Sequence, residues 1–352
     1  MKLFACDHCG NTLYFENALC ERCGHQLGYI PDRNALVSLA EQGGTWSTPA
    51  FPGEHYVFCA NAKFGACNWL VPAVAGADVY CTACRHNETI PAIDDPRNLS
   101  HWQVIERAKK RLLYSVLRLK LPLETRNENP HHGLSFRFLA EDVLAPAPVM
   151  TGHDEGIITI SLAEADDAER ESRRTSMGEP YRTLLGHFRH EIGHHYWDLL
   201  VRGTPAIDGF RALFGDETAD YGLALQTYYA NGAPLGWPQT HISAYATAHP
   251  WEDFAETFAH YLHITDTVEM ASAFGVRARA KTADPSLVVA VNFDPYTQVN
   301  IGSIVDNWVP LASMLNNLNR AMGHPDAYPF ILTPVVIEKL GFVHALVRGQ
   351  GR

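Results

Sequence analysis

The chain has 352 residues, 46% of them hydrophobic, and a formal net charge of −11 from 28 Lys and Arg against 39 Asp and Glu. This composition is typical of globular proteins and excludes a fibrous or largely disordered chain, and the length predicts about two domains. An acidic protein lacks the basic surface that nucleic-acid binding requires, so no nucleic-acid partner is expected.

The N-terminus reaches Cys6 and Asp7 before the apolar core of a signal peptide can form. No apolar stretch is long enough to cross a bilayer, so no membrane partner is expected. We therefore expect a cytoplasmic protein whose cysteines are reduced rather than paired in disulfides.

All eight cysteines lie near the N-terminus, between Cys6 and Cys84. Four of them form two CxxC pairs with the spacing of a tetrahedral zinc site, which we predict to be structural: Cys6, Cys9, Cys20 and Cys23. The other four predict a second structural zinc site: Cys59, Cys67, Cys81 and Cys84. His55 or His86 could replace a thiolate in the second site, and the two sets could interleave.

The segment before residue 95 is rich in Gly, Pro and short polar turns and shows little helical periodicity. A domain of this kind cannot close a large hydrophobic core and is expected to rely on bound metal. We therefore predict an N-terminal double zinc ribbon over residues 1–95 and a second domain over residues 96–352.

The second domain is predicted to begin with a helix. Ser100 and Gln103 form a capping box at its start, and Pro122 ends it. One face of this helix is basic and is expected to be a solvated surface: Arg107, Lys109, Lys110, Arg111, Arg118 and Lys120.

Two short strands are predicted over 134–139 and 157–162, because both segments are rich in β-branched and aromatic residues. The second is a candidate edge strand that could pair with an extended peptide. From about Pro180 the pattern is helical, with further helices expected near 216–230, 250–264, 303–322 and 334–347. A few strands followed by several helices predict an α+β fold, a mainly helical domain with a small β-sheet.

The first of these helices contains His190-Glu191-Ile192-Gly193-His194. Residues four apart share a helix face, so His190 and His194 can both present a nitrogen to one zinc ion. Glu191 projects beside the pair, where it can hold a zinc-activated water and act as general base. This HExxH pattern within an apolar helix predicts a catalytic zinc site.

Catalytic zinc usually has three protein ligands, so one is still needed. Pro250 starts a helix on which Glu252 and Glu256 share a face, and we predict Glu252 as the third ligand. Glu256, one turn on, is placed to accept a hydrogen bond from the far nitrogen of a ligand histidine. The alternative for both is a solvated acidic face. Other carboxylates and histidines are expected to cap helices or pack in the interior instead: Asp216, Glu217, Asp220, His260 and His263.

HExxH followed by a glutamate on a later helix resembles the gluzincin peptidases. Tyr245, seven residues before Glu252, is similar to a tyrosine in the catalytic domain of anthrax lethal factor. This resemblance implies that Tyr245 stabilises the oxyanion and that Glu252, rather than Glu256, binds the metal. A neutral hydroxyl is a suitable donor to a developing oxyanion, although core packing is the alternative role for Tyr245. The whole chain resembles bacterial zinc-binding metallopeptidases with an N-terminal zinc-ribbon region.

The sequence thus predicts a zinc metallopeptidase with a zincin-like domain, holding one catalytic and two structural zinc ions and acting on peptide or protein substrates. The alternative is a binding module in which the ribbons capture a protein or nucleic acid and the zincin domain is a non-catalytic scaffold.

Overall fold

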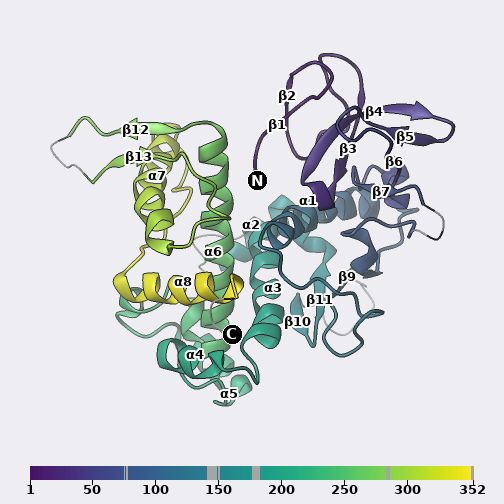
Figure 1. Cartoon of the computed structure of the whole chain (residues 1–352). Coiled ribbons are helices and arrows are strands. Elements are labelled where there is room, and N and C mark those ends of the chain that lie inside the picture. The colour runs from purple at the N-terminus through teal and green to yellow at the C-terminus, as the bar shows by residue number, and fades with distance from the viewer. Residues whose placement is uncertain are drawn as a thin grey trace. The chain divides into compact units, whose positions relative to one another are not determined.

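The computed structural model describes residues 1–74, 76, 78–140, 149, 151–176, 183–282 and 286–349. The chain forms two compact units, an N-terminal unit (Met1–Glu171) and a C-terminal unit (Ser172–Arg352) (Figure 1). The division between the units lies well after residue 95, so the N-terminal unit holds more than the ribbon region. Among the described residues, no helix is both long enough and apolar enough to span a membrane.

The ribbon region is mainly β-structure. A two-stranded hairpin of β1 (Phe4–Ala5) and β2 (Thr12–Leu13) precedes an antiparallel sheet whose five strands follow chain order. These are β3 (Gln26–Ile30), β4 (Ala35–Gln42), β5 (Thr45–Ser47), β6 (His55–Phe58) and β7 (Leu70–Pro72). The sheet closes a small core of five buried side chains: Ile30, Val37, Leu39, Tyr56 and Leu70.

Helix α1 (Pro96–Arg118) begins four residues earlier than predicted. The Asp95 side chain accepts a hydrogen bond from the backbone nitrogen of Arg97 at 2.8 Å, and Pro96 occupies the first helical position. An acidic N-cap followed by proline is a strong start signal, because proline has no N–H to leave unpaired there. The prediction of a start at Ser100 was therefore wrong.

The basic face of α1 is only partly solvated. Lys109 and Lys110 are buried, and their ammonium groups lie 2.8 and 2.6 Å from the two oxygens of buried Glu106. The prediction of a solvated surface was wrong for these two lysines, because a buried carboxylate requires cationic partners. Arg107 and Lys120 are exposed, as expected.

A four-stranded sheet completes the N-terminal unit. Its order is β10 (Gly152–Asp154), β11 (Ile157–Ser161), β9 (Ser135–Leu139) and β8 (Asn87–Thr89). Strand β11 is antiparallel to β10 and parallel to β9, so it is paired on both sides and the edge-strand prediction was wrong. Its apolar residues Ile158 and Ile160 are fully buried, as is typical of an interior strand.

The C-terminal unit is helical apart from the β12 (Arg277–Arg279) and β13 (Val288–Ala290) hairpin. Its helices are α3 (Leu184–Leu200), α4 (Ala206–Phe214), α5 (Tyr221–Asn231), α6 (Pro250–Ala273), α7 (Ile301–Ala321) and α8 (Pro334–Val347), while α2 (Asp167–Ser176) crosses the division between the units. The predicted α+β class, with a β-rich N-terminal region and a mainly helical remainder, is confirmed. Pro180 and Tyr181, in the predicted first turn of α3, lie outside the described residues.

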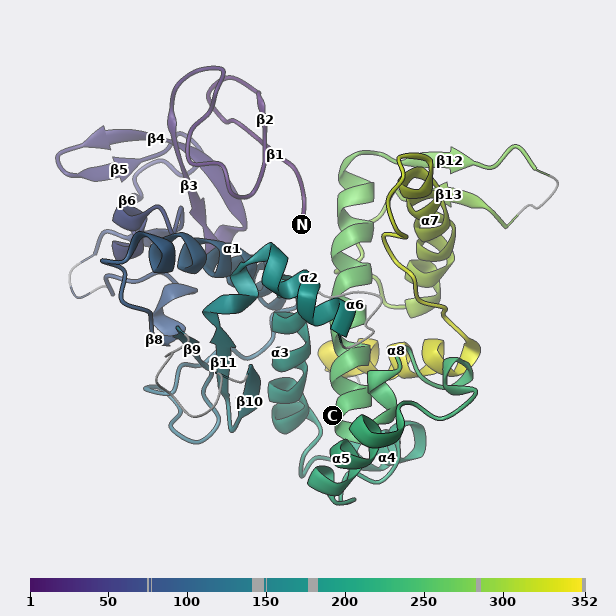
Figure 2. The same cartoon turned by 180° about the vertical axis from the view of Figure 1, so that it is seen from behind.

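Helix α6 is the centre of the C-terminal unit and packs against α3, α4, α7 and α8. Figures 1 and 2 show α3 along one side of α6 and α7 along the other. The aromatic residues Phe188 and Tyr196 of α3 and Phe254 and Phe258 of α6 are fully buried, with the rings of Tyr196 and Phe258 stacked 5.6 Å apart. The HExxH helix and the Glu252 helix are thus direct neighbours.

Candidate metal centre

The N-terminal ends of α3 and α6 are both defined by side-chain caps. The Thr183 hydroxyl accepts from the backbone nitrogen of Gly186 at 3.0 Å and starts α3. His249 Nδ1 accepts from the backbone nitrogen of Trp251 at 3.1 Å, and Pro250 fills the first position of α6. These caps place His190 in the middle of one helix and Glu252 in the first turn of the other.

Three predicted ligands converge at the α3–α6 contact. The two Nε2 atoms of His190 and His194 are 3.1 Å apart, and Glu252 Oε2 lies 3.0 Å from the first and 3.5 Å from the second. Zinc bonds of about 2.0–2.1 Å in a tetrahedron separate neighbouring ligand atoms by roughly 3.4 Å, so the three atoms fit one zinc ion. Glu252 Oε2 is buried and has no partner with hydrogen-bond geometry, as a metal-ligand atom requires.

The electrostatics of the cluster favour a cation. Burial by itself would lower the pKa of His190, but the carboxylates of Glu252 and Glu256 raise it well above its ordinary value. Burial would raise the pKa of Glu252, but His194 and His190 hold it well below the usual range. The negative potential that holds a proton on the imidazole also holds a metal ion in its place.

Glu256 lies where the sequence predicts it, behind His190. Its Oε1 is 2.7 Å from His190 Nδ1, and its Oε2 accepts from the Ser243 hydroxyl at 2.6 Å. Burial raises the pKa of Glu256, but the contact with His190 brings it down to about 2. An ionised acceptor on Nδ1 leaves Nε2 of His190 with its lone pair directed at the metal position.

Tyr245 and Glu191 flank the same cluster. The Tyr245 ring centre lies 5.8 Å from that of His190, and Tyr245 begins a short 3-10 turn, Tyr245–Thr247, that packs against α6. Burial and the charge of Glu252 raise the pKa of Tyr245, which keeps its hydroxyl protonated. The Glu191 side chain, next to His190 on α3, is largely buried. The structure therefore brings His190, His194, Glu252, Glu256 and Tyr245 together, and Glu191 follows His190 on the same helix.

Two close contacts of the ligands were not predicted from the sequence. The Tyr221 hydroxyl donates to Glu252 Oε1 at 2.7 Å, and the Trp251 ring lies 4.2 Å from the His194 ring. Trp251 directly precedes Glu252 in the sequence, but nothing in the sequence links Tyr221 to a residue 31 positions later. His260 Nδ1 instead pairs with the Tyr328 hydroxyl at 2.7 Å, and His263 Nδ1 lies 3.3 Å from Arg189.

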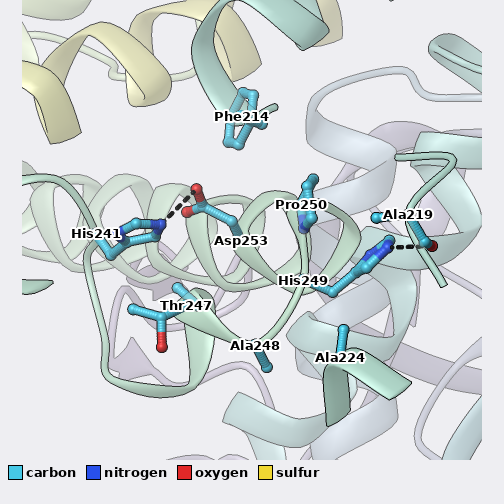
Figure 3. Close-up of a pocket in the computed structure, with 10 residues that line it drawn as sticks. Phe214, Ala219, Ala224, His241, Thr247, Ala248, His249, Pro250 and Asp253 are labelled. Carbon is cyan, nitrogen blue, oxygen red and sulfur yellow. Dashed lines mark hydrogen bonds and ion pairs between the residues drawn. The ribbon is translucent and has the colours of Figure 1, made fainter. Parts of the chain in front are cut away.

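A cavity of about 300 Å³ lies beside the segment that joins Tyr245 to Glu252 (Figure 3). Small and apolar residues form much of its wall: Phe214, Ala219, Ala224, Ala246, Ala248 and Pro250. Asp253 contributes a buried carboxylate that Lys339 Nζ contacts at 2.5 Å, and His241 Nε2 lies 3.6 Å from it. The carboxylate charge is therefore balanced within the protein, which leaves the cavity mainly apolar.

The first cysteine set forms a cluster in the ribbon region. The Sγ atoms of Cys6 and Cys23 are 3.8 Å apart and those of Cys9 and Cys20 are 3.6 Å apart, close to the roughly 3.8 Å separation expected around zinc with 2.3 Å bonds. Each CxxC pair is followed by a glycine with positive φ, Gly10 and Gly24, whose backbone nitrogen closes the turn. A left-handed turn after the second cysteine needs glycine, because a Cβ would be strained there.

The second cysteine set forms a separate cluster of Cys59, Cys67, Cys81 and Cys84, so the two sets do not interleave. The imidazoles considered as substitutes are not ligands in this arrangement, since His86 Nδ1 pairs with the Leu134 carbonyl at 2.9 Å and His55 is exposed.

Buried charges lie beside the second cysteine cluster. The Cys84 Sγ lies 3.7 Å from Glu106 Oε2. Burial lowers the pKa of Lys110, but the charges of Cys67, Glu106 and the other thiolates raise it well above its usual value.

Comparison with known protein families matches residues 98–346 to the family described as "Putative zinc-binding metallo-peptidase", and residues 3–95 to a zinc-ribbon domain. Curated relatives include uncharacterized proteins of Mycobacterium tuberculosis and Mycobacterium bovis. Each is 41% identical over 348 residues, covering 99% of this chain and 95% of the relative. No solved structure gives a significant match. The chain therefore belongs to this zinc-binding metallo-peptidase family and carries an N-terminal zinc ribbon.

Proposed function

We propose that the protein is a gluzincin-like zinc peptidase that hydrolyses peptide bonds in peptides or proteins. One observation carries this proposal: the lone-pair atoms of His190, His194 and Glu252 converge within 3.5 Å of one another, and Glu191 follows His190 on the same helix. Three ligands, an open fourth position and an adjacent carboxylate are the requirements of a hydrolytic zinc centre.

The proposal includes one catalytic and two structural zinc ions per chain. His190, His194 and Glu252 would hold the catalytic ion, and the two four-cysteine clusters would hold the structural ions. The clusters have complete ligand sets with no open position, so a structural role suits them. Four-thiolate sites need reduced cysteines, which supports our proposal of a cytoplasmic location. We assign the ribbons to residues 1–95 and the peptidase domain to residues 96–352.

When bound, zinc polarises the scissile carbonyl and lowers the pKa of water. Glu191 takes the proton from the attacking water and passes it to the leaving amine. The Tyr245 hydroxyl, which stays protonated, donates a hydrogen bond to the carbonyl oxygen as negative charge develops there. Glu256 keeps the His190 imidazole oriented through Nδ1 while these steps proceed.

The test is Glu191→Gln, which keeps the size of the side chain and removes the base. Zinc content should stay unchanged, while turnover of a peptide library should fall by roughly 10²–10⁴-fold. Glu338→Gln on the exposed face of α8 is the matched control and should behave as the unmodified chain. Normal cleavage by Glu191→Gln would overturn the assignment and favour the non-catalytic binding module.

A further inference from the structure

The two carboxylate oxygens of Glu252 face different partners. Oε2 lies between the two histidine rings, 3.0 Å from His190 Nε2 and 3.5 Å from His194 Nε2. Oε1 accepts a hydrogen bond from the Tyr221 hydroxyl at 2.7 Å. The side chain is 1% exposed, so water cannot substitute for this donor without entering the site.

Tyr221 is held in place by α6 itself. Its ring centre lies 5.2 Å from that of His249 and 5.6 Å from that of Trp251. His249 Nδ1 accepts from the Trp251 backbone, so Nε2 carries the proton and donates to the Ala219 carbonyl at 3.1 Å (Figure 3). His249, which caps α6, thus also holds the chain two residues before Tyr221 through this hydrogen bond.

The rest of α5 is weakly anchored by packing. None of its residues is buried, and Leu223 and Tyr229 are 60% and 61% exposed. The helix begins at Tyr221, where the Asp220 side chain accepts from the Leu223 backbone nitrogen at 2.9 Å. The contact of Tyr221 with Glu252 is therefore not a by-product of a packed core.

We propose that Tyr221 is a positioning residue whose hydroxyl occupies Oε1 of Glu252 and so restricts this glutamate to one-oxygen ligation of the metal. The inference rests on the proposed metal site of the peptidase. Without the donor, Oε1 is free to turn toward the metal as a further ligand. That would fill the position that a catalytic zinc site keeps open for water and substrate.

The test is Tyr221→Phe in the full chain, which removes the hydroxyl and keeps the ring contacts with His249 and Trp251. Thr227→Ala is the matched control, because it removes a hydroxyl of α5 that bonds only within the helix, to the Leu223 carbonyl. Zinc affinity is measured by competition with a chelator. Cobalt(II) is then exchanged into the site, and the intensity of its visible absorption reports whether it has four or five ligands.

The metal content and the cobalt absorption of His194→Ala, which lacks a ligand of the proposed catalytic site, are subtracted from those of each protein. Metal bound by the cysteines then does not contribute. Tyr221→Phe should bind metal with an affinity changed by roughly 10–100-fold and should show the weaker cobalt absorption of higher coordination, whereas Thr227→Ala should match the unmodified chain. Unchanged affinity and spectrum in Tyr221→Phe would overturn the proposal. Because no peptide is used, this outcome is distinct from a failed peptidase assignment, which Glu191→Gln tests. An unmodified chain that binds no more metal than His194→Ala would contradict the metal site and both proposals.

Discussion

At the scale of single residues, each candidate ligand of the catalytic metal is held by a second side chain. Glu256 supports His190, Tyr221 supports Glu252, and the Trp251 ring packs against His194. Such outer contacts fix the orientation of a ligand before the metal arrives, which reduces the entropy lost on binding. We expect substitutions of these supporting side chains to change metal affinity, and substitutions of the residues that act on the substrate to change turnover.

Glu256→Ala should lower zinc affinity of the catalytic site by roughly 10–100-fold, because Nδ1 of His190 loses its acceptor. Ser243→Ala removes the hydroxyl that donates to Glu256 Oε2 and also accepts from the Ala246 backbone nitrogen, and it should have a smaller effect in the same direction because Glu256 itself remains. Competition titration with a chelator measures both. Equal affinity in Glu256→Ala and the unmodified chain would show that this contact does not support the metal.

Tyr245→Phe should lower kcat by roughly 10²–10³-fold with little change in KM, because the hydroxyl acts on charge that develops only in the transition state. Steady-state kinetics on a cleaved peptide separate the two constants. An effect confined to KM would assign Tyr245 to substrate binding.

At the scale of elements, the site depends on how closely α3 and α6 approach each other. Gly193 lies inside the HExxH motif and faces the backbone of α6. A Cβ at this position would lie 2.9 Å from Ala255 Cα and 3.1 Å from its carbonyl oxygen. The absence of a side chain at Gly193 therefore lets His190 and His194 come within reach of Glu252.

Gly193→Ala should destabilise the fold by roughly 1–3 kcal/mol, because the clash is with backbone that cannot move aside, and should weaken metal binding by separating the helices. Gly341→Ala on α8 is the control, since its nearest neighbour is 3.6 Å away. The control should be neutral or stabilising by about 1 kcal/mol through helix propensity. Urea unfolding of both variants decides the point, and a Gly193→Ala chain as stable as the control would contradict this account.

The C-terminal half of α6 carries a half-buried histidine, His263, whose neutral form is favoured in the folded chain. Burial and the nearby Arg189 lower the pKa of His263 to about 3, below the roughly 6.5 of an unfolded chain. Its neighbours are Asp266 on the same helix, Trp308 of α7 and Tyr328. The unfolded chain therefore binds a proton that the folded chain excludes, so stability is complete above pH 6.5 and falls as the pH drops toward 3.

His263→Asn should flatten this dependence by up to about 1.4 kcal/mol per pH unit between pH 6 and pH 4, because the titrating group is gone. Denaturant unfolding at several pH values gives the slope of unfolding free energy against pH for the unmodified chain and for His263→Asn. Metal release at low pH affects both proteins and cancels in the difference between the slopes. Parallel slopes for the two proteins would show that His263 does not carry the acid sensitivity.

At the scale of the whole molecule, the candidate metal ligands are distributed between the two compact units. Both cysteine clusters lie in the N-terminal unit, and the histidine–glutamate cluster lies in the C-terminal unit. No candidate site in the described part of the chain draws ligands from both units. The three clusters also share no ligand, so loss of one ion should leave the others bound.

The unmodified chain should hold three zinc ions, and Cys67→Ser and His194→Ala should each hold two. The double variant should hold one, because the sites are independent. Elemental analysis of the purified proteins counts the ions. Limited proteolysis should show faster cleavage of the N-terminal unit in the two proteins that carry Cys67→Ser and not in His194→Ala. Three ions in Cys67→Ser would remove the second cluster from the proposal.

Short-range spacing in the sequence determines the parts of each cluster that lie within one element. Residues i and i+4 of a helix must share a face, so His190 and His194 are neighbours wherever their helix lies, and the CxxC pairs follow the same local logic. The start of α6 and the bounds of α8 were likewise readable, because proline at the first helical position and a regular apolar pattern are local signals. The end of α6 was not, since the helix continues to Ala273, beyond the predicted end near residue 264.

Only the tertiary structure decides what depends on residues far apart in the chain. The pairing of β11 on both sides, the burial of Lys109 and Lys110 around Glu106, and the hydrogen bond from Tyr221 to Glu252 all involve partners chosen by packing. The sequence of a strand does not show whether it lies at the edge or in the middle of its sheet. The sequence around a charged side chain likewise does not show whether it is exposed or buried. The free energy that separates these outcomes comes from neighbours that only the folded chain brings together.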